Sequence, residues 1–401
     1  MARNSLGRPF WTFWTAATLA NLGDGIRLAA FPLLAAALSS DPRAVAGVAA
    51  AQFLPWLVTG LYAGVLADRR GARALLAATD AARVVVLVTL AVAVATGGAT
   101  IALVVAAAFL LGAAETVRDT AAQTAIPRLV PDARLERANG RLVAGEVVGN
   151  EFVGPPLGAV LFATGAALPF AVNGASLALA VMLVLSLPLT LARRTPVEPG
   201  APVRAWDGLR WLVRRPVLRT LAFTVAAIAA ADSAWFAIFV LYAQQNLGLH
   251  ALGFGLLLAT GAAGGVAGSF AADRLVGAFG HRHVLTWSMA STAGFPVLLV
   301  VAPNLVAAVV VVTATSAAFA VLNVAALAVR QRLVPDGLVG RVVAASRTLT
   351  YGCSALGALT GGVLAAAAGT GAPFLFSAVI AVAAPLAWAI VSRPVAPGAP
   401  A

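Results

Sequence analysis

Lysine is absent from the chain, so all 27 of its basic residues are arginines. Charge of either sign is scarce, because only 10% of the residues are charged, against roughly 25% in an ordinary soluble domain. The single cysteine, Cys353, excludes an intramolecular disulfide, and its apolar neighbours favour a packing role over a reactive thiol. These shortages exclude a water-soluble globular protein and a disulfide-stabilised secreted domain.

Motifs for nucleotide, ester or metal chemistry are missing as well. The chain has no Walker-type phosphate loop, no nucleophile elbow and no HExxH motif, which argues against ATP-driven transport and hydrolysis. The segment His281-Arg-His283 has no acid or thiol near it, and a loop that contacts lipid headgroups explains it better than a metal site. We therefore predict a protein that is not an enzyme and that needs no metal and no cofactor.

Apolar residues dominate what is present. They make up 61% of the chain, the mean hydropathy is +0.93, and long apolar runs recur between short polar or Gly/Pro breaks. Runs that extend to about 20 residues span a bilayer as helices. We predict an all-α membrane protein with twelve transmembrane helices, at residues 10–37, 44–66, 74–96, 100–122, 141–163, 167–191, 217–243, 251–273, 284–302, 305–329, 342–367 and 372–391.

The arginines collect in alternate loops. Nearly all arginines outside the predicted helices lie in one set of alternate loops or at the two termini. The other set of loops carries only Arg43. This asymmetry follows the positive-inside rule, so we expect both termini in the cytoplasm. Arginine-only, alanine-rich usage is typical of a GC-rich bacterial genome, which places the protein in a bacterial inner membrane. The net charge of +12 therefore indicates contact with membrane lipids and not a nucleic-acid partner.

One long polar break, at residues 192–216, interrupts the apolar segments. It divides the chain into two six-helix halves, 1–191 and 217–401, and we predict that it is a cytoplasmic linker between them. Trp206 and Leu212 would lie on one apolar face of a helix, with the arginines of the segment elsewhere, so a short helix on anionic headgroups is one interpretation. An irregular basic loop is the other.

The two halves resemble one another. Three landmarks recur in the same order, with separations of 208, 205 and 204 residues: Asp24 and Asp232, Asp68 and Asp273, and Arg128–Asp132 and Arg332–Asp336. One such match arises easily by chance, but three in register indicate a duplication. Parallel six-helix repeats are typical of a transporter whose site lies between its halves.

Two motifs carry a resemblance to a known family. The segment Gly64–Arg73, Gly-Val-Leu-Ala-Asp-Arg-Arg-Gly-Ala-Arg, resembles the loop between helices 2 and 3 of the major facilitator superfamily, with Ala72 in place of the first basic residue. The segment Gly154–Ala159, with Gly145 before it, is similar to the antiporter motif of helix 5, and Ala159 departs from the family's second glycine.

More of the chain resembles the enterobactin exporter and macrolide efflux branch of that superfamily. The segments that carry this likeness are Asn21–Ile26, Ala125–Pro131, Glu136–Gly140 and Gly208–Arg219. The resemblance covers nearly the whole chain. It implies a major facilitator fold and proton-driven export of an amphiphilic small molecule, such as a drug, macrolide, siderophore or other natural product, by alternating access.

Ionisable groups inside the predicted helices are the candidates for coupling and binding, because a charge at the bilayer centre costs roughly 2.5–3.5 kcal/mol. Seven acids qualify: Asp24, Asp80, Glu115, Asp119, Glu146, Glu151 and Asp232. A buried carboxylate is costly when charged, which allows such a group to take up and release a proton. These acids therefore make proton coupling feasible.

Asp24 is the first choice for the coupling site, with Arg27 on the same helical face at i+3. Its counterpart in the second half, Asp232, has Trp235 at i+3, which suits an amphiphilic ligand with a cationic or polar group. A structural ion pair is the alternative for Asp24, and helix packing is the alternative for Asp232.

Two further helices carry grouped charges. Glu115, Arg118 and Asp119 share one side of the fourth predicted helix, where Arg118 can neutralise one acid and leave the other free to titrate. A gate between the halves or a static salt bridge would fit this group. Glu146 and Glu151 flank the glycine-rich stretch of the fifth helix, and Glu151 is the better cavity candidate.

By the resemblance, charged residues at cytoplasmic helix ends form a latch that holds the cytoplasmic side closed. These residues are Asp68, Arg69, Arg73, Asp273 and Arg274. We expect Asp80 and Arg83, at i and i+3 of the third predicted helix, to pair with the latch. The alternative is that these arginines only fix the orientation in the membrane.

Other functions stay open. The fold does not set the direction of transport, so uptake or facilitative transport of a small molecule is an alternative to efflux. A non-transporting membrane scaffold or sensor is a third interpretation, which acids at mid-membrane disfavour. Because two halves complete a cavity within one chain, we expect a monomer.

Overall fold

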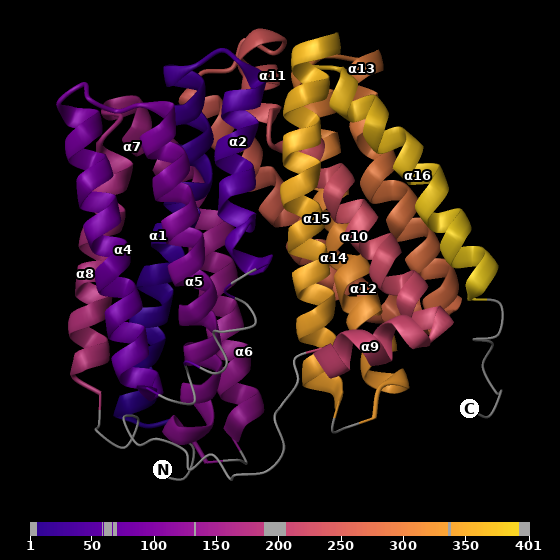
Figure 1. Ribbon diagram of the computed structural model, residues 1–401, viewed down its shortest axis with the longest axis horizontal. Helices are drawn as coiled ribbons and strands as arrows, with labels where there is room; N and C mark the ends of the chain where they lie inside the picture. Colours follow the sequence, from indigo (N-terminus) through magenta and orange to yellow (C-terminus); the bar gives the residue numbers. More distant parts are fainter. Residues whose placement is uncertain are drawn as a thin grey trace. The chain divides into compact units, whose positions relative to one another are not determined.

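The structure, a computed structural model, describes residues 6–57, 59, 66, 70–131, 134–187, 206–335 and 338–392. Every regular element among these residues is a helix, which confirms the predicted all-α class (Figure 1). In chain order the elements are α1 (Arg8–Leu38), α2 (Pro42–Phe53), α4 (Ala72–Ala95), α5 (Ile101–Leu129), α6 (Leu135–Glu146), the π-helix η3 (Val147–Val153), α7 (Gly154–Thr164), α8 (Leu168–Leu185), α9 (Trp206–Arg214), α10 (Pro216–Phe236), α11 (Phe239–Gln245), α12 (Ala251–Gly294), the 3-10 helix η5 (Phe295–Val297), α13 (Leu298–Val301), α14 (Leu305–Leu333), α15 (Val339–Ala368) and α16 (Ala372–Val391).

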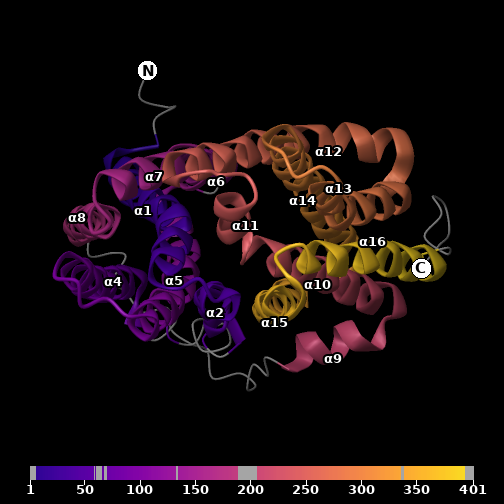
Figure 2. The ribbon, with the colours of Figure 1, turned by 90° about the horizontal axis from the view of Figure 1, so that it is seen from above.

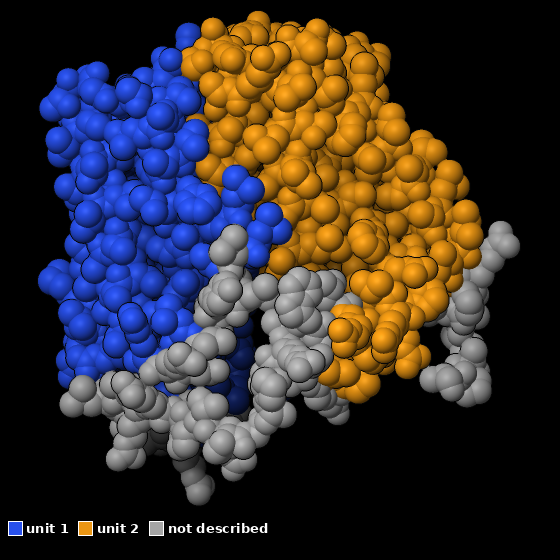
Figure 3. Space-filling view, in the orientation of Figure 1, with its two compact units in different colours: residues 1–38, 54–201, 250–259 blue, residues 39–53, 202–249, 260–401 orange. Residues whose placement is uncertain are grey.

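The chain packs as two compact units, coloured separately in Figure 3. Unit 1 comprises residues 1–38, 54–201 and 250–259, and unit 2 comprises residues 39–53, 202–249 and 260–401. Each unit thus takes in one short segment from the other half of the sequence. In unit 1 the start of α12 packs on α7, because Gly255 lies close to Ala159 and to the Pro155 carbonyl.

In unit 1, α1 is the central helix. It packs against α5, α6, α7 and α8, and Figure 2 looks along these helices. Small residues allow the closest approach: Gly25 lies against the backbone of Gly149 and Asn150, and Gly158 lies against Ile26. Backbone contacts of this kind are typical of membrane helices, which associate through close packing. They hold η3 and α7 tightly beside the middle of α1.

In unit 2, α10 packs against α15 and α16. Gly357 and Gly361 of α15 lie against the backbone of Ala230 and Ala234 of α10. Each pair is four residues apart, so the small residues form one continuous contact face along each helix.

The local geometry of the two halves repeats. The helices α5 and α14 both have 29 residues. Each begins at a cap, Thr100 or Asn304, whose side chain accepts a hydrogen bond from the backbone N–H three residues further on. The turns before the third predicted helix of each half contain Gly71 and Gly280. Their φ angles are 77° and 75°, values that residues with an L side chain rarely adopt. The duplication is therefore visible in the backbone as well as in the residue types.

Two segments refine the predicted boundaries. Helix α12 runs past the predicted end at residue 273 and is interrupted only at Gly280. The linker contains a helix, α9, so the interpretation as an irregular loop is wrong for its second half. Leu212 of α9 is buried in an apolar cluster with Leu218 and Val342, which fixes α9 against the ends of α10 and α15.

The helix surfaces are apolar. Eight helices of the described chain are long and apolar enough to cross a bilayer, whereas the sequence predicts twelve spans. On α4 the exposed side chains Val85, Val88 and Val92 form one stripe along the helix. Contiguous apolar surface of this kind is stable in lipid and not in water. The chain is a multi-pass membrane protein.

The fifth predicted helix contains an irregularity. Its residues divide into α6, η3 and α7, with a π-helix over Val147–Val153. Pro155 and Pro156 lack the N–H groups that would bond the carbonyls of residues 151 and 152 in an α-helix, which explains why the α-helical ladder is interrupted here. Short π segments often occur at functional sites.

Candidate functional site

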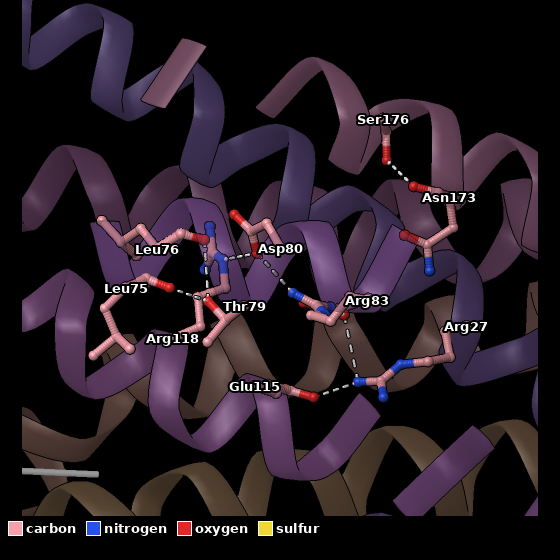
Figure 4. A network of polar contacts seen from close by, with 11 residues as sticks. Arg27, Leu75, Leu76, Thr79, Asp80, Arg83, Glu115, Arg118, Asn173 and Ser176 are labelled. Carbon is pink, nitrogen blue, oxygen red and sulfur yellow. Dashed lines mark hydrogen bonds and ion pairs between the residues drawn. The ribbon is translucent and has the colours of Figure 1, made fainter. Parts of the chain in front are cut away.

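Three helices of unit 1 carry the same short pattern, an acid followed by an arginine at i+3. The pairs are Asp24 and Arg27 on α1, Asp80 and Arg83 on α4, and Glu115 and Arg118 on α5. This spacing puts both groups of a pair on one helical face. The three faces meet inside unit 1 (Figure 4).

The six groups form one chain in which acids and arginines alternate. Arg27 Nη2 lies 2.5 Å from Glu115 Oε2 and 3.4 Å from Asp24 Oδ1. Arg83 contacts Asp24 and lies 3.5 Å from Asp80 Oδ1. The order is therefore Glu115, Arg27, Asp24, Arg83 and Asp80, with Arg118 at the end. Its Nε donates a hydrogen bond of 2.8 Å to Asp80 Oδ1.

This row of six alternating acids and arginines, here called the charge chain, is buried except at one end. Asp80 and Arg83 are 0% and 1% exposed, whereas the side chain of Glu115 is 28% exposed. Three carboxylates balance three guanidinium groups, which lowers the cost of holding them in the membrane. Arg27 Nη1, Asp80 Oδ2 and Arg83 Nε have no hydrogen-bond partner among the described residues. The network is neutral, but its hydrogen bonds are not fully satisfied among the described residues.

Two expected partnerships differ from the sequence interpretation. Arg118 was expected to neutralise an acid of its own helix, but it bonds to Asp80 of α4. Arg83 was expected to belong to the latch, but it contacts Asp24. Both differences arise because an arginine side chain is long enough to reach an acid on another of the three helices. Asp119, one turn after Glu115, makes no ion pair within the described part of the chain.

In unit 2, Asp232 and Trp235 lie on α10 next to an aromatic cluster. Trp235 is 2% exposed, and its ring packs edge-on against Phe239 at 5.2 Å between centroids. Phe374 lies 5.9 Å from Trp235. Trp235 Nε1 has no hydrogen-bond partner among the described residues. Asp232 is partly buried and, in the same described ranges, forms no ion pair.

The two glutamates of the fifth predicted helix lie at the π segment. Glu151 is part of η3, Glu146 is the last residue of α6, and both are exposed. Because Gly25 packs on the backbone of η3, this segment lies beside Asp24. A change in the conformation of η3 would therefore shift Asp24, which belongs to the charge chain.

The residues of the predicted latch are only partly visible. Asp68 and Arg69 lie outside the described residues. Arg73 donates a hydrogen bond to the carbonyl of Leu185, at the C-terminal end of α8, where a cation is favoured by the helix dipole. Asp273 and Arg274 are exposed on α12, and Arg274 bonds to the Phe270 carbonyl of its own helix at 3.4 Å.

One signal in the sequence could have revealed the charge chain. The acid and arginine at i+3 occur three times in the first half, on three separate predicted helices. A buried face with both charges on each of three neighbouring helices predicts cross-helix pairing, because each face alone leaves its groups incompletely bonded. The pattern does not say which arginine meets which acid.

Comparison with known proteins agrees with this architecture. The chain is 27% identical over 389 residues to the multidrug efflux pump Tap of Mycobacterium tuberculosis, covering 93% of this chain and 91% of that protein. Among solved structures, a mutant form of the nucleoside transporter NupG matches with a TM-score of 0.81 at 13% identity, covering 96% and 100% of the two chains.

A bacterial homologue of the lysosomal transporter Spinster, in an inward-facing and unoccupied conformation, matches with a TM-score of 0.73 at 16% identity and covers 98% of both chains. At these identities the two structures show the fold alone. The model of the transmembrane secretion effector family, MFS_3, matches residues 7–397. The chain belongs to this transporter family of the major facilitator type.

Proposed function

We propose that the protein is a proton-coupled exporter of amphiphilic small molecules that works by alternating access. The observation that carries this proposal is the charge chain, since a neutral, incompletely bonded set of six charges is expensive to keep at membrane depth without a function. The 27% identity to a multidrug efflux pump supports export as the direction.

In this proposal the charge chain is the coupling element. Asp24 shares its carboxylate between Arg27 and Arg83, and Glu115 gives the chain its open end. Proton uptake by an acid at the charge chain would change the charge that its three arginines balance, and the arginines would then change partners. Because each partner belongs to a different helix, such a change moves α1 relative to α4 and α5.

The substrate site is proposed at Asp232 and Trp235 of unit 2, and Glu151 of unit 1 is proposed separately as a residue that contacts substrate. An unpaired carboxyl beside a large aromatic cluster suits a molecule with a cationic group and an apolar body. This chemistry fits drugs and natural products that are both charged and hydrophobic.

The remaining expectations complete the proposal. The halves 1–191 and 217–401 would alternate access across the linker 192–216, with both termini in the cytoplasm of a bacterium and the chain in its inner membrane as a monomer. Asp68, Arg69, Arg73, Asp273 and Arg274 would form the latch. Asp80 and Arg83, which lie in the charge chain, would connect it to the latch through α4.

Transport by purified protein in liposomes tests the proposal. With an imposed proton gradient and ethidium as the probe, the wild type should accumulate ethidium against its concentration gradient, and a protonophore should collapse the accumulation. Asp24→Asn should abolish accumulation but still allow ethidium to equilibrate. Asp41→Asn, an exposed acid before α2, is the matched control and should behave as wild type.

Two results would contradict the proposal. A wild type that only equilibrates ethidium is a facilitator, and an Asp24→Asn variant that accumulates it normally shows that the charge chain does not couple. Growth of bacteria that express the protein separates the directions, because export protects the cells from toxic amphiphiles and uptake sensitises them.

A further inference from the structure

The three arginines of the charge chain balance its three acids, and one neighbouring acid is left without an arginine. The charge chain contains three acids and three arginines, and every acid in it contacts at least one guanidinium group. Asp119 is a fourth acid on the same side of α5 as Glu115, four residues further on. With Asp119 ionised, the region carries one negative charge in excess of its arginines.

The acids of the charge chain are poor places for a proton. Asp24 contacts both Arg27 and Arg83, and Asp80 contacts both Arg83 and Arg118. Protonation of either carboxylate would leave buried guanidinium groups without their counter-charge, which is strongly unfavourable. Glu115 is more exposed, but it lies 2.5 Å from Arg27, and this contact favours its ionised form.

The surroundings of Asp119 are different. The charged groups that act on it are Glu115 and Arg118 of its own helix, Asp24 of α1 and Arg83 of α4. Both arginines already bond to other acids, Arg118 to Asp80 and Arg83 to Asp24. Of the other helices that pack on α5, α6 carries Glu136, Arg137, Arg141 and Glu146.

Asp119 lies toward the accessible end of the charge chain. It is partly buried, and Glu115, on the same side of α5, is the open end of the charge chain. Asp80 and Arg83, by contrast, are almost completely buried. No ion pair holds Asp119 within the described ranges.

We propose that Asp119, which lies beside the charge chain and is not part of it, is the group that binds the proton, and that Asp24 stays ionised throughout. This inference rests on the proposed function for the use of the proton in transport, but the protonation itself does not depend on it. One proton adds to one carboxylate oxygen, and the acid and its neighbours then become neutral overall. Ionised Asp119 attracts Arg118 away from Asp80, whereas protonated Asp119 leaves the bond between α4 and α5 intact.

Infrared spectroscopy of the purified protein in liposomes tests the protonation directly, since a protonated carboxyl has its own C=O absorption. At pH 7, Asp119→Asn should remove one carboxyl component of this absorption, and Asp24→Asn should remove none. Asp119→Glu should retain the component at a shifted frequency. An absorption that Asp119→Asn leaves unchanged, or that Asp24→Asn removes, overturns the proposal.

Two controls keep the test decisive. If Asp119→Asn does not fold, Asp119→Glu alone decides, because an unshifted component would exclude Asp119 as its source. Ethidium accumulation is measured on the same samples. Loss of the component in Asp119→Asn, together with a wild type that does not accumulate ethidium, would uphold Asp119 as the proton site and reject the proposed function.

Discussion

Arg118 of α5 bonds to Asp80 of α4, although Glu115 and Asp119 stand near it on its own helix. The bond, 2.8 Å from Nε to Oδ1, joins two helices at a place where both side chains are nearly inaccessible. It closes one end of the charge chain. Because Arg27 contacts Glu115, Asp119 is the acid of α5 without an arginine among the described residues.

Asp80→Asn should destabilise the protein. The substitution removes the charge that balances Arg118 and part of Arg83, and breaking a buried pair from one side costs about 3–5 kcal/mol. Thermal unfolding in detergent, compared with wild type, measures the effect. Asp273→Asn, at an exposed acid of α12, is the control and should shift stability by less than about 0.5 kcal/mol. Equal melting of Asp80→Asn and wild type would show that the bond carries no stability.

Gly25→Ala should disturb the contact between α1 and the π segment. A methyl group there would overlap the carbonyl oxygens of Gly149 and Asn150, and overpacking of this kind costs about 1–3 kcal/mol. Ethidium accumulation should fall with stability, because Asp24 is the next residue. Gly140→Ala is the matched helical control, since nothing lies near its added methyl group. Gly140→Ala should stabilise the protein by about 0.5–1 kcal/mol, because it removes a glycine from the interior of a helix. Tolerance of both substitutions would argue against a close-packing role for Gly25.

Asp232→Asn should weaken binding of cations and spare neutral compounds. Loss of the unpaired carboxylate beside Trp235 should raise the Kd of ethidium about tenfold, which corresponds to about 1.4 kcal/mol. Nile red, which is uncharged, should bind within about twofold of wild type. Both dyes are followed by fluorescence titration of the protein in nanodiscs. A similar loss for the two dyes would mean that Asp232 supports helix packing and not ligand charge.

Anionic lipid should stabilise the protein through α9. Arg210, Arg214 and Arg215 are exposed, and Arg215 lies over the Trp211 ring at 5.5 Å. Arginines at an anionic membrane surface contribute about 1 kcal/mol each. The increase in Tm on changing nanodiscs from phosphatidylcholine to phosphatidylglycerol should therefore be lost when all three are replaced by glutamine.

The control for the lipid prediction lies at the other end of unit 2. Arg43 lies beside Gly362 of α15, whereas α9 packs in a cluster with Val342 of the same helix. Those two positions are 20 residues apart, a rise of about 30 Å, which matches the thickness of a bilayer core. Arg43→Gln should leave the lipid effect unchanged. If it removes the effect as fully as the triple variant, the effect is not specific to α9.

The amino-acid sequence by itself determined the membrane class, the all-α fold and the family. These properties depend on local features: apolar length, the placement of Arg in loops, and glycines or caps that each helix needs at its ends. Thr100 and Asn304 illustrate this, because a cap acts within three residues of its own position. The same local logic identified the acids inside the helices as candidates.

Only the tertiary structure decided how those acids are paired. A spacing of i and i+3 places Asp24 with Arg27 on one face, but it does not say which group of another helix meets that face. The packing of α4 on α5 brings Arg118 to Asp80, and the long side chain of Arg83 reaches from α4 to Asp24 of α1. Because each arginine compensates the acids it reaches, the packing of the three helices leaves Asp119 as the acid without an arginine among the described residues.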